Sequence, residues 1–527
     1  MAQRRHNFIS GAAVLALAVA VTKVLGALYK IPLGNLLDKE GMAHFYAAYN
    51  IYNLLLVLST AGLPLALSRL VSRAAAQGRR NAQHRIFRTA LALLAVIGAV
   101  CSAVMCLFPQ VLSGLLHDSL AAPAIRVLGP AVLFVCLTSA IRGYTQGLGD
   151  MTPTAVSQMT ESAGKLVIGL ALCLVLLHRG ADSSLCAAGA IAGVTAGSLL
   201  SLTVLTVFLL RRRDRAAVDV PPARSAVLRE LLTVGIPITL GAAGMSLITL
   251  LDQALVMSTL QNTLGYTEAA ATALYGEYTF GMTLFALPPS FIYPVTVSLV
   301  PDISAALARS DRPAAGRSAA AALKLTTLIA LPTGAGLSVL AGPILRLLYP
   351  AVPDTAAAAA YHLTILGIAC IFVCLMVATN GVLQAYGKEY IPVVTLLCGG
   401  ILKIITNYLM VGDPATNVRG APVSTLYCYG LIVVLNLIAI ARCVPERPSY
   451  LHLFARPVLI TAVMALAARS SYGLLSRSLP ERWAVLPAIA VAVVVYGVLV
   501  LALGAVTRQD VLDLPKGEKI ARMLHLH

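Results

Sequence analysis

Residues 143–165 read GYTQGLGDMTPTAVSQMTESAGK, and residues 381–403 read GVLQAYGKEYIPVVTLLCGGILK. Glycine, glutamine, glycine and lysine recur at the first, fourth, seventh and last positions of both stretches, which begin 238 residues apart. The two final lysines, Lys165 and Lys403, lie deep inside apolar segments that are long enough to cross a bilayer. The sequence therefore predicts a duplicated membrane protein with a cation inside the membrane in each half, a pattern that favours an anionic ligand.

The composition of the whole chain is that of an integral membrane protein. Of its 527 residues, 58% are hydrophobic and 12% are charged, whereas soluble proteins carry about 25% charged residues. The apolar runs are rich in Leu, Ala and Val without alternating polarity, which favours helices over a β-barrel. We predict an all-α fold with about 14 transmembrane helices, near residues 8–37, 43–73, 83–108, 121–148, 153–178, 184–211, 227–260, 270–305, 315–348, 357–386, 390–412, 416–443, 451–476 and 482–506.

The net charge of +17 follows the expected membrane topology rather than a nucleic-acid surface. Of the 39 Lys and Arg residues, 26 fall in segments that would be cytoplasmic if the N-terminus is inside, eight fall outside and five within spans. The positive-inside rule then predicts both termini in the cytoplasm of a multi-pass plasma-membrane protein. No nucleic-acid partner is expected.

The duplication also sets the expected domain organisation. Tyr46 and Tyr49 match Tyr275 and Tyr278 at an offset of 229. Each half contains six predicted helices, an even number, so the two halves enter the membrane in the same direction as a parallel repeat. We expect an N-lobe over 1–215, a C-lobe over 225–445, and two further helices with a cytoplasmic tail over 446–527.

Three prolines interrupt apolar helices at positions suited to hinges. They are Pro32, Pro64 and Pro294, and the last two nearly match between the halves. Proline removes a backbone hydrogen bond, and the freed carbonyl must face protein or a water-filled cavity. Bent helices of this kind favour alternating access, although membrane helices also tolerate proline without such a role.

Enzyme signatures are absent from the sequence. It contains no HExxH, GxxxxGK[ST] or GxSxG motif, and no paired His and Cys set with metal-ligand spacing. We therefore expect no catalytic residues, no enzyme activity, no metal site beyond sodium, and no cofactor.

Charged residues within the spans are the strongest functional signal. A charge at the bilayer centre costs from about 2.5 to more than 10 kcal/mol, so such groups should face a cavity or a partner. Snorkelling and structural ion pairs are the alternative interpretations. The excess of cations predicts a cavity that binds a phosphate-type anion. The cations are Lys23, Lys30, Arg142, Lys165 and Lys403, and their candidate partners are Glu161, Asp252 and Glu277.

The local surroundings of these lysines differ. Glu161 precedes Lys165 by four residues, the favourable order for a helical ion pair, so Lys165 is expected to be partly neutralised. Lys403 has Asn407 at the corresponding distance and no carboxylate. Lys23 and Lys30 lie seven apart on one face of the first helix, which makes that helix the favoured anion site.

A set of polar side chains in the second half is suited to a coupling ion. Asp252, Asn407, Ser424 and Thr425 offer carboxylate, amide and hydroxyl oxygens from neighbouring helices. Such oxygens bind a hard cation such as Na⁺, and Asp252 could instead carry a proton. The alternative is hydrogen bonding between helices.

Several short motifs resemble a known family. The stretch TKVLG (22–26) resembles the first-helix signature of MurJ-type flippases, and AYNIYN (48–53), GLPLA (62–66) and SRLVS (68–72) resemble its Gram-positive branch. That branch includes the stage V sporulation protein B group and polysaccharide-biosynthesis proteins of the MOP (multidrug/oligosaccharidyl-lipid/polysaccharide) superfamily. The resemblance extends over the whole chain, including two added C-terminal helices.

The resemblance implies a flippase for undecaprenyl-pyrophosphate-linked sugars such as lipid II, serving peptidoglycan, spore cortex or polysaccharide synthesis. It implies two lobes around a central cavity, with Lys23 at the family's essential first-helix cation position. Asp252, Asn407 and Thr425 would fall near its sodium-site positions. The sequence departs from the Gram-negative members, whose further arginines are replaced by Tyr29 and by Asn53 with its neighbours, so their arginine mechanism does not carry over unchanged.

Two alternatives remain open from sequence. A MATE-like drug or cation antiporter, coupled to Na⁺ or H⁺, would share the architecture but needs a dominant carboxylate in its cavity. A non-transporting scaffold for cell-wall or spore-coat enzymes would have no use for lysines in mid-membrane. We expect a monomer that contacts membrane lipid and a lipid-linked anionic sugar, with cell-wall synthesis enzymes as further partners.

Overall fold

The computed structural model describes residues 2–211, 219–444 and 450–505, except for the side chains of some helical stretches such as 2–17 and 293–302. The described residues form helices joined by short connections and contain no strand. Twelve of the described helical segments are long and apolar enough to cross a membrane. The all-α membrane class is confirmed, but the count of fourteen is not. The predicted spans 8–37 and 270–305 are helical without belonging to these twelve.

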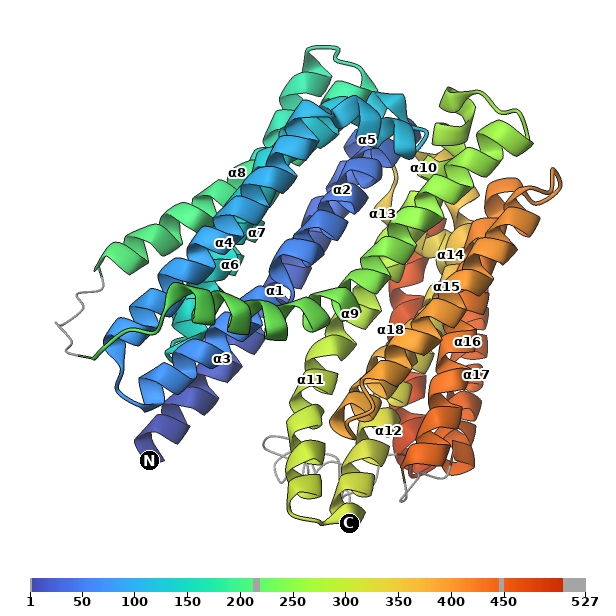
Figure 1. Ribbon diagram of the computed structural model, residues 1–527. Coiled ribbons are helices and arrows are strands. Elements are labelled where there is room, and N and C mark those ends of the chain that lie inside the picture. Colours follow the sequence, from blue (N-terminus) through green and yellow to red (C-terminus); the bar gives the residue numbers. More distant parts are fainter. Residues whose placement is uncertain (1, 212–218, 445–449, 506–527) are drawn as a thin grey trace. The chain divides into compact units, whose positions relative to one another are not determined.

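The predicted spans correspond to the helices shown in Figure 1. The helices are α1 (Ala2–Leu36), α2 (Lys39–Thr60), α3 (Leu63–Ala76), α4 (Arg80–Leu107), α5 (Pro109–Leu115), α6 (Ala122–Gly147), α7 (Thr152–His178), α8 (Ser183–Arg211), α9 (Arg224–Ser258), α10 (Glu268–Phe285), α11 (Leu287–Ala308), α12 (Arg312–Val339), α13 (Ala341–Leu348), α14 (Pro353–Ala385), α15 (Tyr390–Val411), α16 (Gly420–Cys443), α17 (Tyr450–Leu475) and α18 (Glu481–Ala502). Three short helical turns join them: η1 (Ser119–Ala121), η2 (Thr259–Thr263) and η3 (Asn417–Arg419).

The chain divides into two compact units. Unit 1 comprises Met1–Thr279 with Asn407–Val418, and unit 2 comprises Phe280–Thr406 with Arg419–His527. This division differs from the lobes expected from the repeat because α9 packs along α2 and α3 and so belongs to unit 1. The two units are defined by how closely their helices pack, whereas the two lobes are inferred from the sequence repeat. The lobes therefore stay a prediction.

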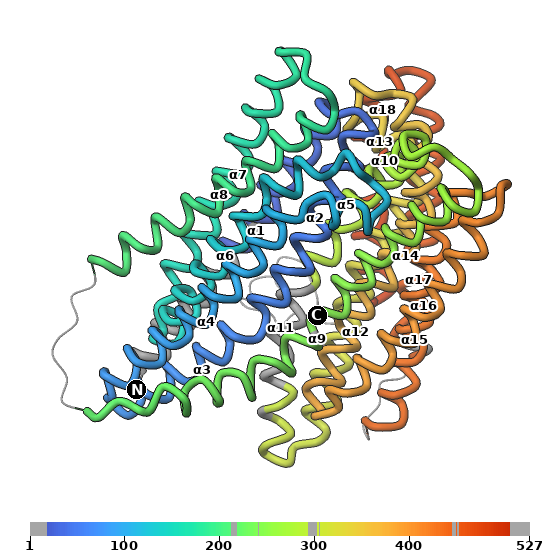
Figure 2. Tube along the Cα trace, turned by 45° about the horizontal axis from the view of Figure 1, so that its top comes forward, coloured from blue at the N-terminus to red at the C-terminus, as the bar shows by residue number. Residues whose placement is uncertain are grey.

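In unit 1, α7, which carries Lys165, packs closely against α8. A Cβ atom on Gly193 would lie 2.3 Å from the Cα atom of Gly169, and one on Gly197 would lie 2.5 Å from the carbonyl oxygen of Glu161. Small residues four apart allow membrane helices to approach in this way. Helix α1 also packs against α7, and both helices lie in the blue-to-teal part of the molecule in Figures 1 and 2.

A helix break separates α2 from α3 within the predicted span 43–73, which is confirmed as one candidate membrane span, Lys39–Ala76. Helix α2 begins at Asp38, whose carboxylate accepts the backbone N–H of Gly41 at 2.7 Å and caps the helix. It ends at Thr60, and the N–H of Gly62 donates to the hydroxyl of Thr239 at 3.1 Å. The predicted hinge Pro64 therefore lies in the first turn of α3, a position that tolerates proline.

Helix α9 changes direction along its length, as Figure 1 shows, and contains Pro237. In its first half, Val227, Leu231, Gly235 and Thr239 recur every fourth residue and are buried, where the helix packs on α3 and α4. The second half belongs to the apolar span Ala242–Thr263 and packs on α2. Proline within a helix accounts for such a bend.

Unit 2 is built around α14, which packs against α11, α12, α13 and α16. A buried amide, that of Asn436 on α16, donates to Thr379 and Asn380 and accepts from Thr395. Helices α17 and α18 pair with each other, and Met464 and Val485 contribute to their shared apolar core. Polar groups in this unit thus satisfy one another across helices, as lipid surroundings require.

Candidate functional site

Two lysines from different helices of unit 1 lie over one tyrosine ring. The ammonium of Lys30, on α1, is 5.3 Å from the ring centroid of Tyr49 on α2, and that of Lys165, on α7, is 4.9 Å from it. Lys30 also lies 4.6 Å from the ring of Tyr46 and donates to its hydroxyl at 3.1 Å. Lys165 donates to the hydroxyl of Tyr49 at 3.4 Å and lies 5.1 Å from the ring of Tyr29.

Aromatic rings, rather than carboxylates, surround these two ammonium groups. Within the described residues no ion pair joins Lys30 or Lys165 to a carboxylate. Each cation–π contact is worth about 0.5–2 kcal/mol and leaves the positive charge in place. The ring of Tyr29 is fixed because its hydroxyl donates to the carbonyl of Ala190 at 2.8 Å. The arrangement can therefore accept an anion without first breaking a salt bridge.

Arg142 and Glu161 form an ion pair, which corrects two sequence-based expectations. The guanidinium of Arg142 lies 2.9 Å from the carboxylate of Glu161 and also donates to the hydroxyls of Ser157 and Ser201. Glu161 therefore neutralises Arg142 on α6 instead of Lys165 on its own helix. A guanidinium offers several donors in a fixed plane, so it satisfies a carboxylate better than a single ammonium does. Arg142 is thus already engaged and is not a free cavity cation.

Two other predicted residues lie away from this cluster. Lys23, expected to be the main cation of the first helix, is exposed on α1. Glu277, expected to partner an intramembrane cation, pairs instead with Lys39 at 3.1 Å, at the start of α2. Lys39 is one of the eight Lys and Arg residues expected outside the membrane, so its pairing with Glu277 was not predicted.

The candidate ion-coupling residues already take part in hydrogen bonds within each unit. In unit 1, the amide of Asn407 donates to the carboxylate of Asp252 at 2.6 Å, and both side chains are buried. In unit 2, the ammonium of Lys403 donates to the hydroxyl of Thr425 at 3.0 Å. Ser424 donates to the backbone carbonyl of Ala421. Thr425 thus already accepts a hydrogen bond from a buried ammonium group, whereas the sequence predicted that its hydroxyl would bind Na⁺.

Sequence reasoning missed a polar contact between α2 and α9. The amide of Asn50 donates to the side-chain oxygen of Gln253 at 2.7 Å, and both residues are buried. Next to it lies a cavity of about 120 Å³ lined by Asn50, Asn53, Met245, Ser246 and Thr249. The amides of Asn50 and Asn53 in an otherwise apolar helix could have indicated this contact. From the sequence alone, Asn53 is interpreted only as a neutral replacement of an arginine.

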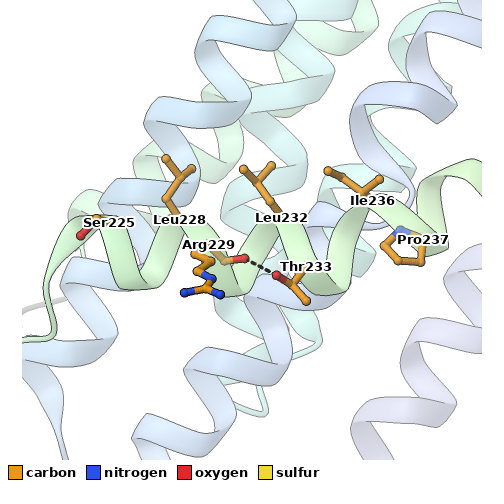
Figure 3. Close-up of a pocket in the computed structure, with 7 residues that line it drawn as sticks. All are labelled: Ser225, Leu228, Arg229, Leu232, Thr233, Ile236 and Pro237. Carbon is orange, nitrogen blue, oxygen red and sulfur yellow. Dashed lines mark hydrogen bonds between the residues drawn. The ribbon is translucent and has the colours of Figure 1, made fainter.

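A second hollow lies along the first half of α9 and has a different chemistry. Its volume is about 560 Å³, and Figure 3 shows its lining side chains along one helix. The lining is mostly aliphatic and includes the guanidinium of Arg229. Its members are Ser225, Leu228, Arg229, Leu232, Thr233, Ile236 and Pro237.

The remaining predicted site residues concern hinges and metals. Pro32 lies inside α1 without ending it, and the side chain of Pro294, in α11, lies outside the described residues. No group of three or more His, Cys, Asp or Glu side chains that could hold a metal ion occurs in the described part of the chain.

The helices and the buried charges define a multi-pass membrane transporter, and comparison with known sequences gives the family. The chain belongs to the polysaccharide biosynthesis protein family, whose model matches residues 8–307, and thereby to the MOP superfamily. The MatE family model also matches residues 237–409. Where a function is named among the similar proteins, it is that of a lipid II flippase or a multidrug transporter, not that of an enzyme.

Three proteins of Bacillus subtilis (strain 168) are similar over most of the chain. An uncharacterized membrane protein, YabM, is 27% identical over 99% of this chain and 97% of its own length. Stage V sporulation protein B is 24% identical, with 84% and 85% covered, and the lipid II flippase MurJ is 24% identical, with 88% of each covered. The chain is therefore a multi-pass plasma-membrane protein and either a flippase of lipid-linked precursors or another MOP transporter.

Solved structures confirm the fold. A lipid II flippase MurJ in an inward closed conformation matches with a TM-score of 0.72 and 14% identity, covering 93% of this chain and 98% of that one. An inward-facing multidrug resistance MATE family transporter of the MOP superfamily matches with a TM-score of 0.66 and 15% identity, covering 82% and 98%.

Proposed function

We propose that this protein moves an undecaprenyl-pyrophosphate-linked sugar across the plasma membrane by alternating access. The pyrophosphate binds between Lys30 and Lys165, the sugar crosses through the protein, and the polyprenyl tail stays in lipid. No covalent chemistry is required, since the substrate leaves unchanged.

The observation that carries this proposal is the pair of ammonium groups over the ring of Tyr49, without carboxylate partners. Two positive charges match the two negative charges of a pyrophosphate diester. The positive charge of Arg142 does not add to these two, because Glu161 neutralises it. The family membership and the similarity to a lipid II flippase are consistent with this substrate class.

The test measures flipping by the purified full-length chain in proteoliposomes. The probe is a fluorescent undecaprenyl-pyrophosphate-linked N-acetylhexosamine, and a quencher added outside reports its transfer. We expect Lys30→Met and Lys165→Met to reduce the rate at least tenfold, because each removes a charge from the site. Lys388→Met is the matched control, since this residue lies between α14 and α15.

Lys23→Met separates the structural proposal from the sequence-based one. We expect it to retain most of the activity because Lys23 is exposed. Loss of flipping in Lys23→Met, with wild-type rates in Lys165→Met, would move the anion site from Lys165 to Lys23. Absence of flipping by the wild type would refute this substrate class.

A MATE-like antiporter is the second candidate, favoured by the match to the MatE model and by the buried carboxylate of Asp252. It predicts ethidium transport that Asp252→Asn abolishes. The amide of Asn407 already bonds that carboxylate, and the two free ammonium groups would repel an organic cation, so we favour the flippase.

Three accompanying features belong to the same proposal. Both termini lie in the cytoplasm, as the distribution of Lys and Arg predicts. The transporter works as a monomer and is available to cell-wall synthesis enzymes as partners. The membrane potential supplies energy, and Lys403 takes the place of a coupling cation beside Thr425.

A further inference from the structure

The polar cavity between α2 and α9 lies close to the two lysines. Asn50 follows Tyr49 directly in the sequence, and Asn53 lies one helical turn further along α2. With a rise of about 1.5 Å per residue, Asn53 is roughly 6 Å along the helix axis from Tyr49. A group attached to a pyrophosphate at the lysines could reach this cavity directly.

The lining of the cavity offers hydrogen bonds without charge. Asn53 and Ser246 make no side-chain hydrogen bond to other described residues and are only partly exposed. Thr249 donates its proton to the backbone carbonyl of Met245 at 3.0 Å, so its oxygen remains available as an acceptor. Neutral amides and hydroxyls suit a sugar, which presents alternating donors and acceptors.

The hydrogen bond between Asn50 and Gln253, next to the cavity, leaves one amide donor unpaired. Asn50 uses its amide nitrogen to bond the oxygen of Gln253, which is fully buried. The amide nitrogen of Gln253 has no hydrogen-bond partner in the described part of the chain. Buried donors are almost always paired, so this cluster lacks an acceptor oxygen. Gln253 itself does not line the cavity, so the carbonyl of an acetamido substituent there would instead accept from the amide of Asn53, which does.

The volume also agrees with a sugar substituent. A water molecule needs about 10–15 Å³ of such space, and the cavity measures about 120 Å³. It therefore has room for an acetamido group or one edge of a pyranose ring. Asp252 does not line it, which disfavours a metal cation.

We propose that the cavity lined by Asn50, Asn53, Ser246 and Thr249 binds the first, N-acetylated sugar of the lipid-linked substrate. This assignment rests on the proposed function, because the pyrophosphate held by Lys30 and Lys165 brings the sugar to α2. It gives the protein selectivity for an N-acetylhexosamine over a plain hexose, which the lysines alone cannot provide.

The experiment compares the binding of three lipids to the full-length chain in nanodiscs. The probes are undecaprenyl pyrophosphate, its N-acetylglucosamine derivative and its glucose derivative. We expect the wild type to bind the N-acetylglucosamine lipid about tenfold tighter than the glucose lipid, which has the same charge, as one or two additional hydrogen bonds provide. Asn53→Leu and Thr249→Val should lose this preference while they still bind undecaprenyl pyrophosphate.

Retained binding of undecaprenyl pyrophosphate shows that a variant is folded. Thr233→Val, the same substitution elsewhere on α9, should keep the full preference. Equal binding of the N-acetylglucosamine and glucose lipids by the wild type, as a cavity filled by water alone would give, overturns the proposal. So does a preference that survives in both cavity variants. Failure of the wild type to bind undecaprenyl pyrophosphate would instead refute the pyrophosphate site together with the assignment that rests on it.

Discussion

The guanidinium of Arg142 and the carboxylate of Glu161 lie 2.9 Å apart, bridging α6 and α7. Both side chains are largely buried, and the pair leaves Lys165, one turn further along α7, free of its nearest acidic neighbour. Lys30 and Lys165 therefore remain without a carboxylate partner, because the carboxylate of Glu161 is taken by Arg142.

Glu161→Gln should destabilise the protein, because it leaves a buried guanidinium without its counter-ion. We expect a loss of roughly 2 kcal/mol, less than the ~3–5 kcal/mol for fully buried pairs, because these side chains are partly exposed. The apparent melting temperature in detergent measures it. The exposed pair of Arg346 with Glu481 provides the control, and Glu481→Gln should change stability by less than about 1 kcal/mol. Equal effects at the two sites would contradict the argument.

Replacements of Tyr49 should separate the contribution of the ring from that of the hydroxyl. Tyr49→Phe keeps the ring under both ammonium groups, and we expect binding of undecaprenyl pyrophosphate to stay within about threefold of wild type. Tyr49→Leu removes the surface that orients Lys30 and Lys165, and binding should weaken about tenfold. Titration of each variant in nanodiscs measures this difference. Identical affinities for the two variants would show that the ring does not orient the lysines.

Gly62→Ala should disturb the break between α2 and α3. A Cβ atom at this position would lie 2.0 Å from the carbonyl oxygen of Gly235 on α9, so the helices must separate. Overpacking of this kind costs about 1–3 kcal/mol and should lower the melting temperature. Gly26→Ala on α1, where nothing lies within 4 Å, is the matched control and should be neutral. A stable, fully active Gly62→Ala would mean that α3 and α9 are not held this closely.

The hydrogen bond of Lys403 predicts that Na⁺ does not stabilise the wild-type protein. Its ammonium already bonds the hydroxyl of Thr425, so replacing Na⁺ by choline at constant ionic strength should leave the wild-type melting temperature unchanged. Lys403→Asn removes the charge and adds an oxygen, and it should gain stabilisation by Na⁺. Lys388→Asn should not. Sodium-dependent stabilisation of the wild type would show that a cation binds in addition to the ammonium.

Asp219 links the connection before α9 to the start of α4, and its role depends on pH. Burial opposes ionisation, but the backbone N–H groups of Asn81 and Ala82, at 2.8 and 3.0 Å, lower the pKa of its carboxyl below the usual 3.8. The stabilisation is therefore present above the unfolded pKa and is lost as the pH falls through the lowered value. Asp219→Asn should melt earlier at neutral pH, with a smaller difference from wild type in acid. Parallel melting curves at all pH values would contradict this.

Long apolar runs made the helices predictable, because a chain in lipid must satisfy its backbone internally. Pro64 predicted an interruption of this span, but not the partner of the N–H of Gly62, because that acceptor is Thr239, 177 residues away. Local hydrophobicity determines where a helix occurs, whereas a distant side chain decides where it can end.

The site residues were predicted by type but not by partner. The sequence identified Lys30 and Lys165, because intramembrane charge is costly and therefore conspicuous. The spacing rule then paired Lys165 with Glu161, but a residue from another helix competes for that carboxylate. Which face of α1 meets α7 is a property of tertiary packing, so the exposure of Lys23 could not be inferred.

The two uncompensated ammonium groups near the ring of Tyr49 have an electrical consequence. Without ligand, the site carries two positive charges, and with a pyrophosphate between them its net charge is near zero. A voltage exerts force on charge at about 2.3 kcal/mol per elementary charge per 100 mV. The conformational change of the loaded carrier would then be almost unaffected by the field. The empty carrier would be driven back toward the negative side of the membrane. The membrane potential would therefore drive the return step of the transport cycle.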